Sequence, residues 1–292
     1  MHAVLHAIVE PGFFSSSNVQ LAIVIGGLVA VVASGVGVFT VLRGQSFAGE
    51  ALGDIGAAGG ASAYLIGIGP LWGFLGINVA AASAMELIGI QRARGRDLAT
   101  GIVLGLGFGL AALFLYLGTT QSHTTGAPIQ ILFGSLFLLP SSNLPLVLAF
   151  AAGTVATLIT LYRPLMLVSV SPELAAARGV PVRLISATYL LAMAVAVALS
   201  ALTIGAILST ALLIGPAATA LRVTNRPHRA FLAAAGIGVA CTWLGLLLAW
   251  DSYYWPPLRY GWPVSFFVVT LVLIAYLASG LRSRGPGSGR GR

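Results

Sequence analysis

Long runs of apolar residues follow one another along this chain, with short polar segments between them. Nine runs have roughly the 20 residues that a helix needs to cross a bilayer. A tenth run, 129–139, is too short to span, which predicts a re-entrant or interfacial segment. The pattern predicts an all-α polytopic transmembrane protein with about eight or nine membrane helices. The nine runs are 18–42, 47–69, 71–90, 98–117, 144–162, 184–201, 204–221, 230–250 and 263–281.

The composition supports a membrane protein and argues against a nucleic-acid binder. Of the 292 residues, 58% are hydrophobic and 8% are charged, whereas soluble domains carry roughly 25% charged residues. The net charge is +8, but the basic residues do not alternate with aromatic residues along one face. We expect one transmembrane domain over residues 1–281, in contact with membrane lipid. The Gly/Ser/Arg-rich tail, 282–292, is predicted to be disordered.

The positions of the arginines predict the orientation of the chain. All 15 basic residues are arginines, and they gather at the ends of the apolar runs. If Arg43 is cytoplasmic and nine segments span, every arginine except Arg259 falls on the cytoplasmic side. Loops on that side carry an excess of positive charge. We therefore expect a multi-pass protein of the plasma or inner membrane, with its N-terminus outside and its C-terminus in the cytoplasm.

Two carboxylates interrupt the second apolar run. Glu50 and Asp54 are four residues apart, so a helix places them one turn apart on the same face. Ionisable side chains at membrane depth are costly and mark ion or substrate paths. Glu86 is a third acid in an apolar run and a weaker candidate. It lies near the cytoplasmic end, where it could also pair with an arginine such as Arg92.

The chain lacks the motifs of an enzyme. It has no lysine, so it cannot contain a Walker A phosphate loop. If ATP drives this protein, a separate subunit must hydrolyse it. The four histidines have no close metal-ligand spacing, and no Ser/His/Asp set can be argued. The single cysteine, Cys241, excludes a disulfide within the chain.

A polar segment, 169–181, has the signals of a short helix of its own. Ser171 suits the N-cap and Pro172 the first helical position, while Gly179 suits the C-terminal cap. The segment is either a simple connector or a docking helix, over about 171–179, that sits in a groove on a cytoplasmic partner and transmits its movement. The candidate coupling residues are Ser171, Pro172, Glu173, Ala175, Arg178 and Gly179.

Several stretches, in chain order, carry a family resemblance. The matching residues are Arg43, Glu50, Asp54 and Gly59; Leu132-Phe133-Gly134-Ser135; Pro172, Glu173, Ala175, Gly179, Pro181 and Val182; and Leu212-Leu213-Ile214-Gly215-Pro216-Ala217-Ala218-Thr219-Ala220. With these motifs the chain resembles the permease subunit of bacterial ABC importers of the zinc/manganese class.

The resemblance implies a fold, a cargo and partners. It implies the architecture of a type II-like ABC-importer permease and a homodimer, with a cytoplasmic ABC ATPase at the docking helix. It also implies an extracytoplasmic solute-binding protein that delivers the ion to the outer loops. The cargo would be a divalent metal ion (manganese, zinc or iron), with no permanently bound cofactor. Glu50 and Asp54 would be its transient ligands.

Two departures from the family pattern bear on the cargo, and a third is mild. Asp54 stands where the family commonly has histidine, and Glu50 stands where it commonly has aspartate. Ser171 replaces an acid, but serine caps a helix as well as aspartate does. Imidazole suits zinc, whereas an all-carboxylate site suits harder cations such as manganese. The motif therefore keeps an ion site and weakens the prediction of zinc.

Other functions remain open at this point. An ABC permease could carry a non-metal or chelated solute, which the missing histidine leaves open. An ATP-independent secondary carrier or channel would show internal repeats with broken helices at matching places. No such repeat stands out. A membrane-embedded enzyme would need several catalytic side chains that meet at one place. The apolar runs supply only Glu50, Asp54 and Glu86 as candidates.

Overall fold

The protein is described from a computed structural model that covers residues 13–88, 93–122, 126–134, 136–224, 226–255 and 261–283. All regular secondary structure in these ranges is helical. The elements are α2 (Ser17–Leu42), α3 (Ser46–Leu65), α4 (Pro70–Ile88), α5 (Ala93–Ser122), α6 (Gly126–Phe133), η1 (Leu136–Leu138), η2 (Ser141–Asn143), α7 (Leu144–Val170), α8 (Pro172–Ala177), α9 (Val182–Ile204), α10 (Ser209–Val223), α11 (Pro227–Ser252) and α12 (Val264–Ser283).

Each of the nine long apolar runs coincides with a helix, which confirms the all-α polytopic prediction. In the described part of the chain, six helices are long and apolar enough to cross a membrane. They are the helices or segments Ser17–Leu42, Thr100–Thr120, Ser141–Val170, Val182–Ile204, Pro227–Ser252 and Val264–Leu281. The predicted count of eight or nine spans therefore stays a prediction.

Three predicted boundaries differ from the structure. The fifth run is predicted over 144–162, but α7 continues through Arg163 and Pro164 to Val170. Proline removes one backbone hydrogen bond, which membrane helices tolerate when their neighbours hold the helix in place. The short tenth run forms α6 and η1 with a break at Gly134. The predicted tail begins inside α12, and residues 284–292, like Arg92, lie outside the described residues.

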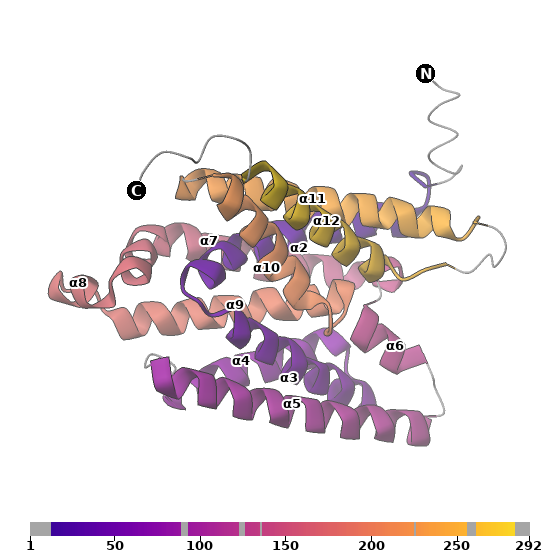
Figure 1. The fold of residues 1–292 in the computed structure, drawn as a ribbon. Helices are drawn as coiled ribbons and strands as arrows, with labels where there is room; N and C mark the ends of the chain where they lie inside the picture. Colours follow the sequence, from indigo (N-terminus) through magenta and orange to yellow (C-terminus); the bar gives the residue numbers. More distant parts are fainter. Residues whose placement is uncertain are drawn as a thin grey trace.

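Two long helices form the centre of the bundle. α2 and α9 are buried along most of their length, and α2 packs against α7, α9, α10 and α11. Figure 1 shows α3, α4 and α5 along one side of the molecule and α11 and α12 along the other. The short helices α8 and α6 lie at opposite ends of the bundle. Because α9 runs between the two sides, it contacts α2, α3, α4, α7 and α10.

Protein surrounds α3, as it does α2 and α9. Every residue from 51 to 61 is buried, and the helix packs against α4, α5, α6, α9 and α10. Small residues make this enclosure possible, because they let neighbouring backbones approach closely. A Cβ at Gly59 would overlap the backbone of Gly73 on α4, and a Cβ at Gly107 on α5 would meet the backbone of Ile55. The helix that carries Glu50 and Asp54 thus has little contact with lipid in this chain.

The turn between α9 and α10 is held by the C-terminal end of α6 and by Gly134, which follows it. Gly205 has a φ of 92°, a conformation that favours glycine. The amide of Ala206 donates to the carbonyl of Ile131 at 3.0 Å. Side chains at Gly134 or Gly205 would collide with the opposite backbone. The first turn of α10 is therefore fixed to the α6 end of the bundle, next to α3.

Gly37→Ala should destabilise the bundle, because the added carbon would overlap the carbonyl of Leu213 and push α2 away from α10. Overpacking of this kind destabilises by about 1–3 kcal/mol. The matched control is Gly35→Ala on the same helix, where the new Cβ would lie 3.7 Å from Leu158 Cδ1. The measurement is the thermal midpoint of the detergent-solubilised protein, followed by size-exclusion chromatography. Equal midpoints for the two variants would contradict this packing.

Candidate functional site

The two predicted carboxylates lie on one face of α3. Glu50 and Asp54 are separated by one turn of a continuous helix, so their side chains are neighbours. Asp54 is 6% exposed, and its Oδ2 atom is buried with no hydrogen-bond partner in the described structure. Glu50 is only partly buried. Since an unpartnered buried carboxylate oxygen is costly, Asp54 strongly favours a cation or a proton beside it.

Polar groups from two other helices contact the glycines of α3. A Cβ on Gly53 would lie 3.0 Å from the hydroxyl of Ser209, in the first turn of α10. A Cβ on Gly56 would lie 2.9 Å from Oδ1 of Asn78 on α4, an oxygen that is buried and has no hydrogen-bond partner in the described structure. Residues two apart on a helix do not face the same side. Asn78 therefore lies on a different side of α3 from Asp54, and the structure does not bring them together.

The carboxylate pair is not part of a larger ligand cluster in one chain. Among the residues that the structure describes, no group of three or more His, Cys, Asp or Glu side chains is placed to hold a metal ion. A divalent cation at Glu50 and Asp54 would need its other ligands from water, backbone carbonyls or a second copy of the chain. A sparse site of this kind suits transient binding better than permanent binding.

The third candidate acid has a different partner. Glu86, in the last turn of α4, lies 3.8 Å from Nε of Arg183 in the first turn of α9. The Arg183 side chain is largely exposed, so this pair contributes little stability. The contact places Glu86 at the α8 end of α9. This position matches the arginine-paired interpretation of Glu86 better than a place beside Asp54.

A buried polar network joins the end of α2 to α9. Arg43 donates from Nη2 to the hydroxyl of Ser186 at 2.8 Å, and its guanidinium lies 5.1 Å from the centre of the Tyr189 ring. The Tyr189 hydroxyl is 2.7 Å from that of Thr40 and donates to the carbonyl of Val36 at 3.2 Å. Tyr189 is fully enclosed. The network fixes the α2–α3 turn, and so the start of the carboxylate helix, to α9.

The short helix predicted over about 171–179 is present as α8. The Ser171 hydroxyl accepts from the amide of Leu174 at 3.2 Å, and Pro172 occupies the first turn, as the sequence predicts. Gly179 has a φ of 77°, which ends the helix in a left-handed residue. Ala175 is buried, while Glu173, Arg178 and the other α8 side chains are exposed. All six candidate coupling residues therefore lie together in one projecting element (Figure 1).

Sequence reasoning missed two features of this region. Asn78 could have been noticed as a lone amide inside an apolar run. The partners of Arg43 could not, because Ser186 and Tyr189 are separated from it by more than 140 residues. Their hydroxyl groups look no different in sequence from the hydroxyl groups that bond within their own helix.

Comparison with known proteins now identifies the family. The model of the ABC 3 transport family matches residues 15–279. The chain belongs to the ABC 3 transport family. The family's match covers α2 to α12, including the carboxylate helix α3 and the short helix α8.

The proteins that this chain resembles include manganese transport proteins. The manganese transport system membrane protein MntC of Halalkalibacterium halodurans is 30% identical over 233 residues, which are 80% of this chain and 78% of that protein. The manganese import system permease protein ScaB of Streptococcus pneumoniae is 26% identical over 238 residues, 80% of this chain and 81% of that protein.

A solved structure has the same fold. A chain of PsaBC from Streptococcus pneumoniae, in complex with Fab, superimposes with a TM-score of 0.74 at 23% identity. The match covers 96% of this chain and 95% of that chain. The ABC-permease fold expected from the resemblance is thus supported over nearly the whole chain.

Ser171→Ala should loosen α8, because the amide of Leu174 loses its side-chain acceptor, the Ser171 hydroxyl. Loss of an N-cap destabilises a helix by about 1 kcal/mol, which corresponds to roughly fivefold faster amide exchange. Ser171→Asp should keep the exchange rate of the wild type, since aspartate caps equally well. Hydrogen–deuterium exchange over residues 172–180 tests this. Unchanged exchange in Ser171→Ala would show that the cap does not hold α8.

Proposed function

We propose that this chain is the membrane-spanning subunit of an ATP-driven importer of divalent metal ions, with Mn²⁺ as the preferred cargo. The observation that carries the proposal is the carboxylate pair on α3. Asp54 is buried with an unpartnered oxygen, and Glu50 lies one turn away. The manganese transport relatives supply the class of cargo.

The chemistry of the pair favours a hard cation. Carboxylate oxygens suit Mn²⁺, Mg²⁺ and Ca²⁺, whereas imidazole and thiolate ligands suit zinc. Neither Glu50 nor Asp54 has a histidine or cysteine beside it in a metal-binding group within the described residues. The pair would hold the ion only transiently, since transport requires both entry and release.

Energy would come from a separate ATPase that binds α8. Leu174 exposes 46% of its surface on this helix, while the buried Ala175 anchors it to the bundle. A short helix with an exposed apolar side chain can seat in a groove on a partner. Its movement would reach α9 directly, because Pro181 follows α8 and forms the N-cap of α9. The hydrogen bonds of Arg43 to α9 would then transmit this movement to the α2–α3 turn.

Two copies would complete the site and the pathway. A homodimer with α3 near its two-fold axis would gather four carboxylates, which one chain cannot do. Its α8 end, rich in arginine, would face the cytoplasm of a plasma-membrane protein. A solute-binding protein would deliver the ion at the opposite, α6 end (Figure 1). Alternating access between these ends would move the ion inward.

Asp54→Asn should lower ATP-driven Mn²⁺ uptake by about 10- to 100-fold, because it removes a charged ligand of the ion. Glu50→Gln should lower it in the same direction. Glu86→Gln is the matched control and should keep uptake near the wild-type rate, since Glu86 pairs with Arg183. Uptake is measured as metal accumulated by proteoliposomes that contain the permease and its ATPase.

ATP hydrolysis by the same complexes separates loss of the site from loss of assembly. It should persist in Asp54→Asn, because α8 is far along the chain from α3 and keeps its docking surface. Full Mn²⁺ uptake by both Glu50→Gln and Asp54→Asn would refute the assignment of the site. No uptake of Mn²⁺, Zn²⁺ or Fe²⁺ by the wild type would instead favour a chelated or non-metal solute.

Asp54→His should raise the ratio of Zn²⁺ to Mn²⁺ transport. The change replaces a hard oxygen ligand with an imidazole nitrogen, which suits zinc, and restores the residue that is common in the resembled family. The ratio is measured by competition between the two ions in the same proteoliposomes. An unchanged ratio would mean that residue 54 does not touch the ion.

A further inference from the structure

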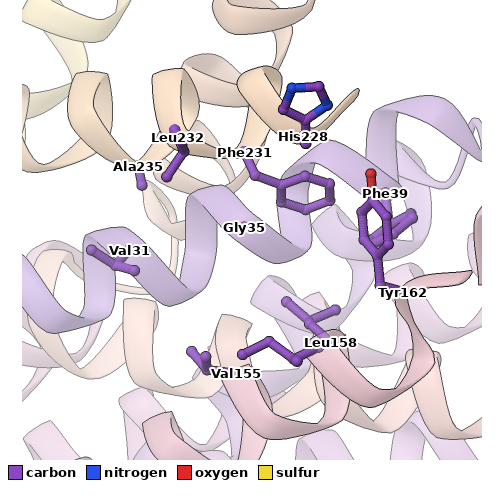
Figure 2. A pocket seen from close by; sticks show the side chains of 11 residues that line it. Val31, Gly35, Phe39, Val155, Leu158, Tyr162, His228, Phe231, Leu232 and Ala235 are labelled. Atoms are coloured by element: carbon purple, nitrogen blue, oxygen red, sulfur yellow. The ribbon is translucent and has the colours of Figure 1, made fainter. Parts of the chain in front are cut away.

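A groove on the outside of the bundle lies away from the carboxylates. It has a volume of about 480 Å³ and is formed between α2, α7 and α11 (Figure 2). Most of its lining is aliphatic or aromatic. Residues that line it include Val31 and Gly35 of α2, Val155 and Ile159 of α7, and Leu232 and Ala235 of α11.

The groove opens on the part of the surface that would face lipid. Both α7 and α11 are long, apolar candidate membrane spans, and the rest of the chain covers only a minority of each. Ile159 on α7 is 70% exposed and Leu232 on α11 is 76% exposed, so the rim of the groove points away from the bundle. In a bilayer these apolar rim residues would contact acyl chains.

Three aromatic rings line one end of the groove. The ring of Phe39 lies 5.1 Å from that of Phe231 and 6.1 Å from that of Tyr162, measured between ring centres. Figure 2 shows these rings together, with His228 beside them. The rings make this end rigid and apolar, and the polar residues begin just beyond it.

Positive charge gathers beyond this aromatic end. Arg163 directly follows Tyr162 on α7, and Arg226 and Arg229 flank His228 at the start of α11. The three arginine side chains are exposed. No acidic residue occurs in segments 31–43, 155–163 or 226–235. The groove is therefore apolar along its length, and these arginines are close in the sequence to Tyr162 and His228, which line its aromatic end.

We propose that this groove binds an anionic phospholipid of the bilayer. One acyl chain would lie between α7 and α11, and the phosphate of its headgroup would be held by Arg163 and Arg229. Basic sites between membrane helices at the cytoplasmic side recognise anionic headgroups in this way. An acyl chain gains little by leaving other lipid tails, because these are as apolar as the groove. Selectivity must therefore come from the charge of the headgroup.

A second copy of the chain fits this face less well. A two-fold interface would place groove against groove, with the same residues facing one another. The arginine ends of the two copies would then meet, and like charges in contact repel. An anionic lipid meets the same arginines with opposite charge. The charge pattern therefore favours lipid over a subunit interface as the occupant.

Native mass spectrometry of the delipidated full chain tests the proposal. The probes are dioleoyl phosphatidylglycerol, which is anionic, and dioleoyl phosphatidylcholine, which is zwitterionic. Each arginine that contacts the headgroup should raise the affinity for the anionic lipid about fivefold, so two arginines should raise it roughly 25-fold. Phosphatidylglycerol should therefore bind about 25-fold more tightly. Equal affinity for the two lipids in the wild type would overturn the proposal.

The double variant Arg163→Gln/Arg229→Gln should lose most of the preference for phosphatidylglycerol. The matched control, Arg183→Gln/Arg222→Gln, removes the same charge from α9 and α10, outside the groove, and should keep the preference. Equal loss in both variants would indicate attraction to overall charge and would refute a site at this groove.

Ala235→Phe fills the groove and should displace the lipid, whereas Ala240→Phe changes an exposed position of α11 that does not line it. If Ala235→Phe instead converts a dimer to a monomer and leaves lipid binding unchanged, the face is an interface between copies and the proposal fails. None of these measurements depends on the transported ion, so they stand apart from the test of metal uptake.

Discussion

A carboxylate at membrane depth has to be shielded from lipid, and this requirement explains much of the bundle. The Asp54 helix, α3, is enclosed by five other helices, and every residue from 51 to 61 is buried. Enclosure is possible because glycines let the neighbouring backbones come close, as at Gly59 against Gly73. The apolar helices α7, α11 and α12, of which the rest of the chain covers only a minority, take positions that face outward.

Different elements connect the two ends of the molecule to α3. At the α8 end, the Arg43 network joins the α2–α3 turn to α9, which begins directly after the α8 loop. At the α6 end, the turn at Gly205 ties the start of α10 to the C-terminal end of α6, and α10 then packs against Gly53. The carboxylate helix therefore lies between two fixed connections, one from each end of the bundle.

The sequence predicts where the helices lie along the chain better than it predicts which helices pack against one another. The apolar runs located nine helices, and the cap at Ser171 located α8, because both signals are local. Hydropathy could not say which helix lies at the centre, since lipid and the protein interior are equally apolar. Glu50 and Asp54 could be found as charges in an apolar run. The enclosure of α3, and the contact of Asn78 with Gly56, could not be found from hydropathy. The path of α7 beyond Pro164 also depends on packing that the sequence alone does not reveal.

On α3, packing and ion chemistry are assigned to different residues. Glycines 49, 53, 56 and 59 contact the neighbouring helices, and there even a methyl group would collide or crowd. Glu50 and Asp54 occupy another side of the same helix and carry the charge. With the ion site proposed at Glu50 and Asp54, a change of cargo would need new side chains at these two positions only, on a backbone that stays in place. The glycine contacts that hold α3 among its neighbours would not have to change.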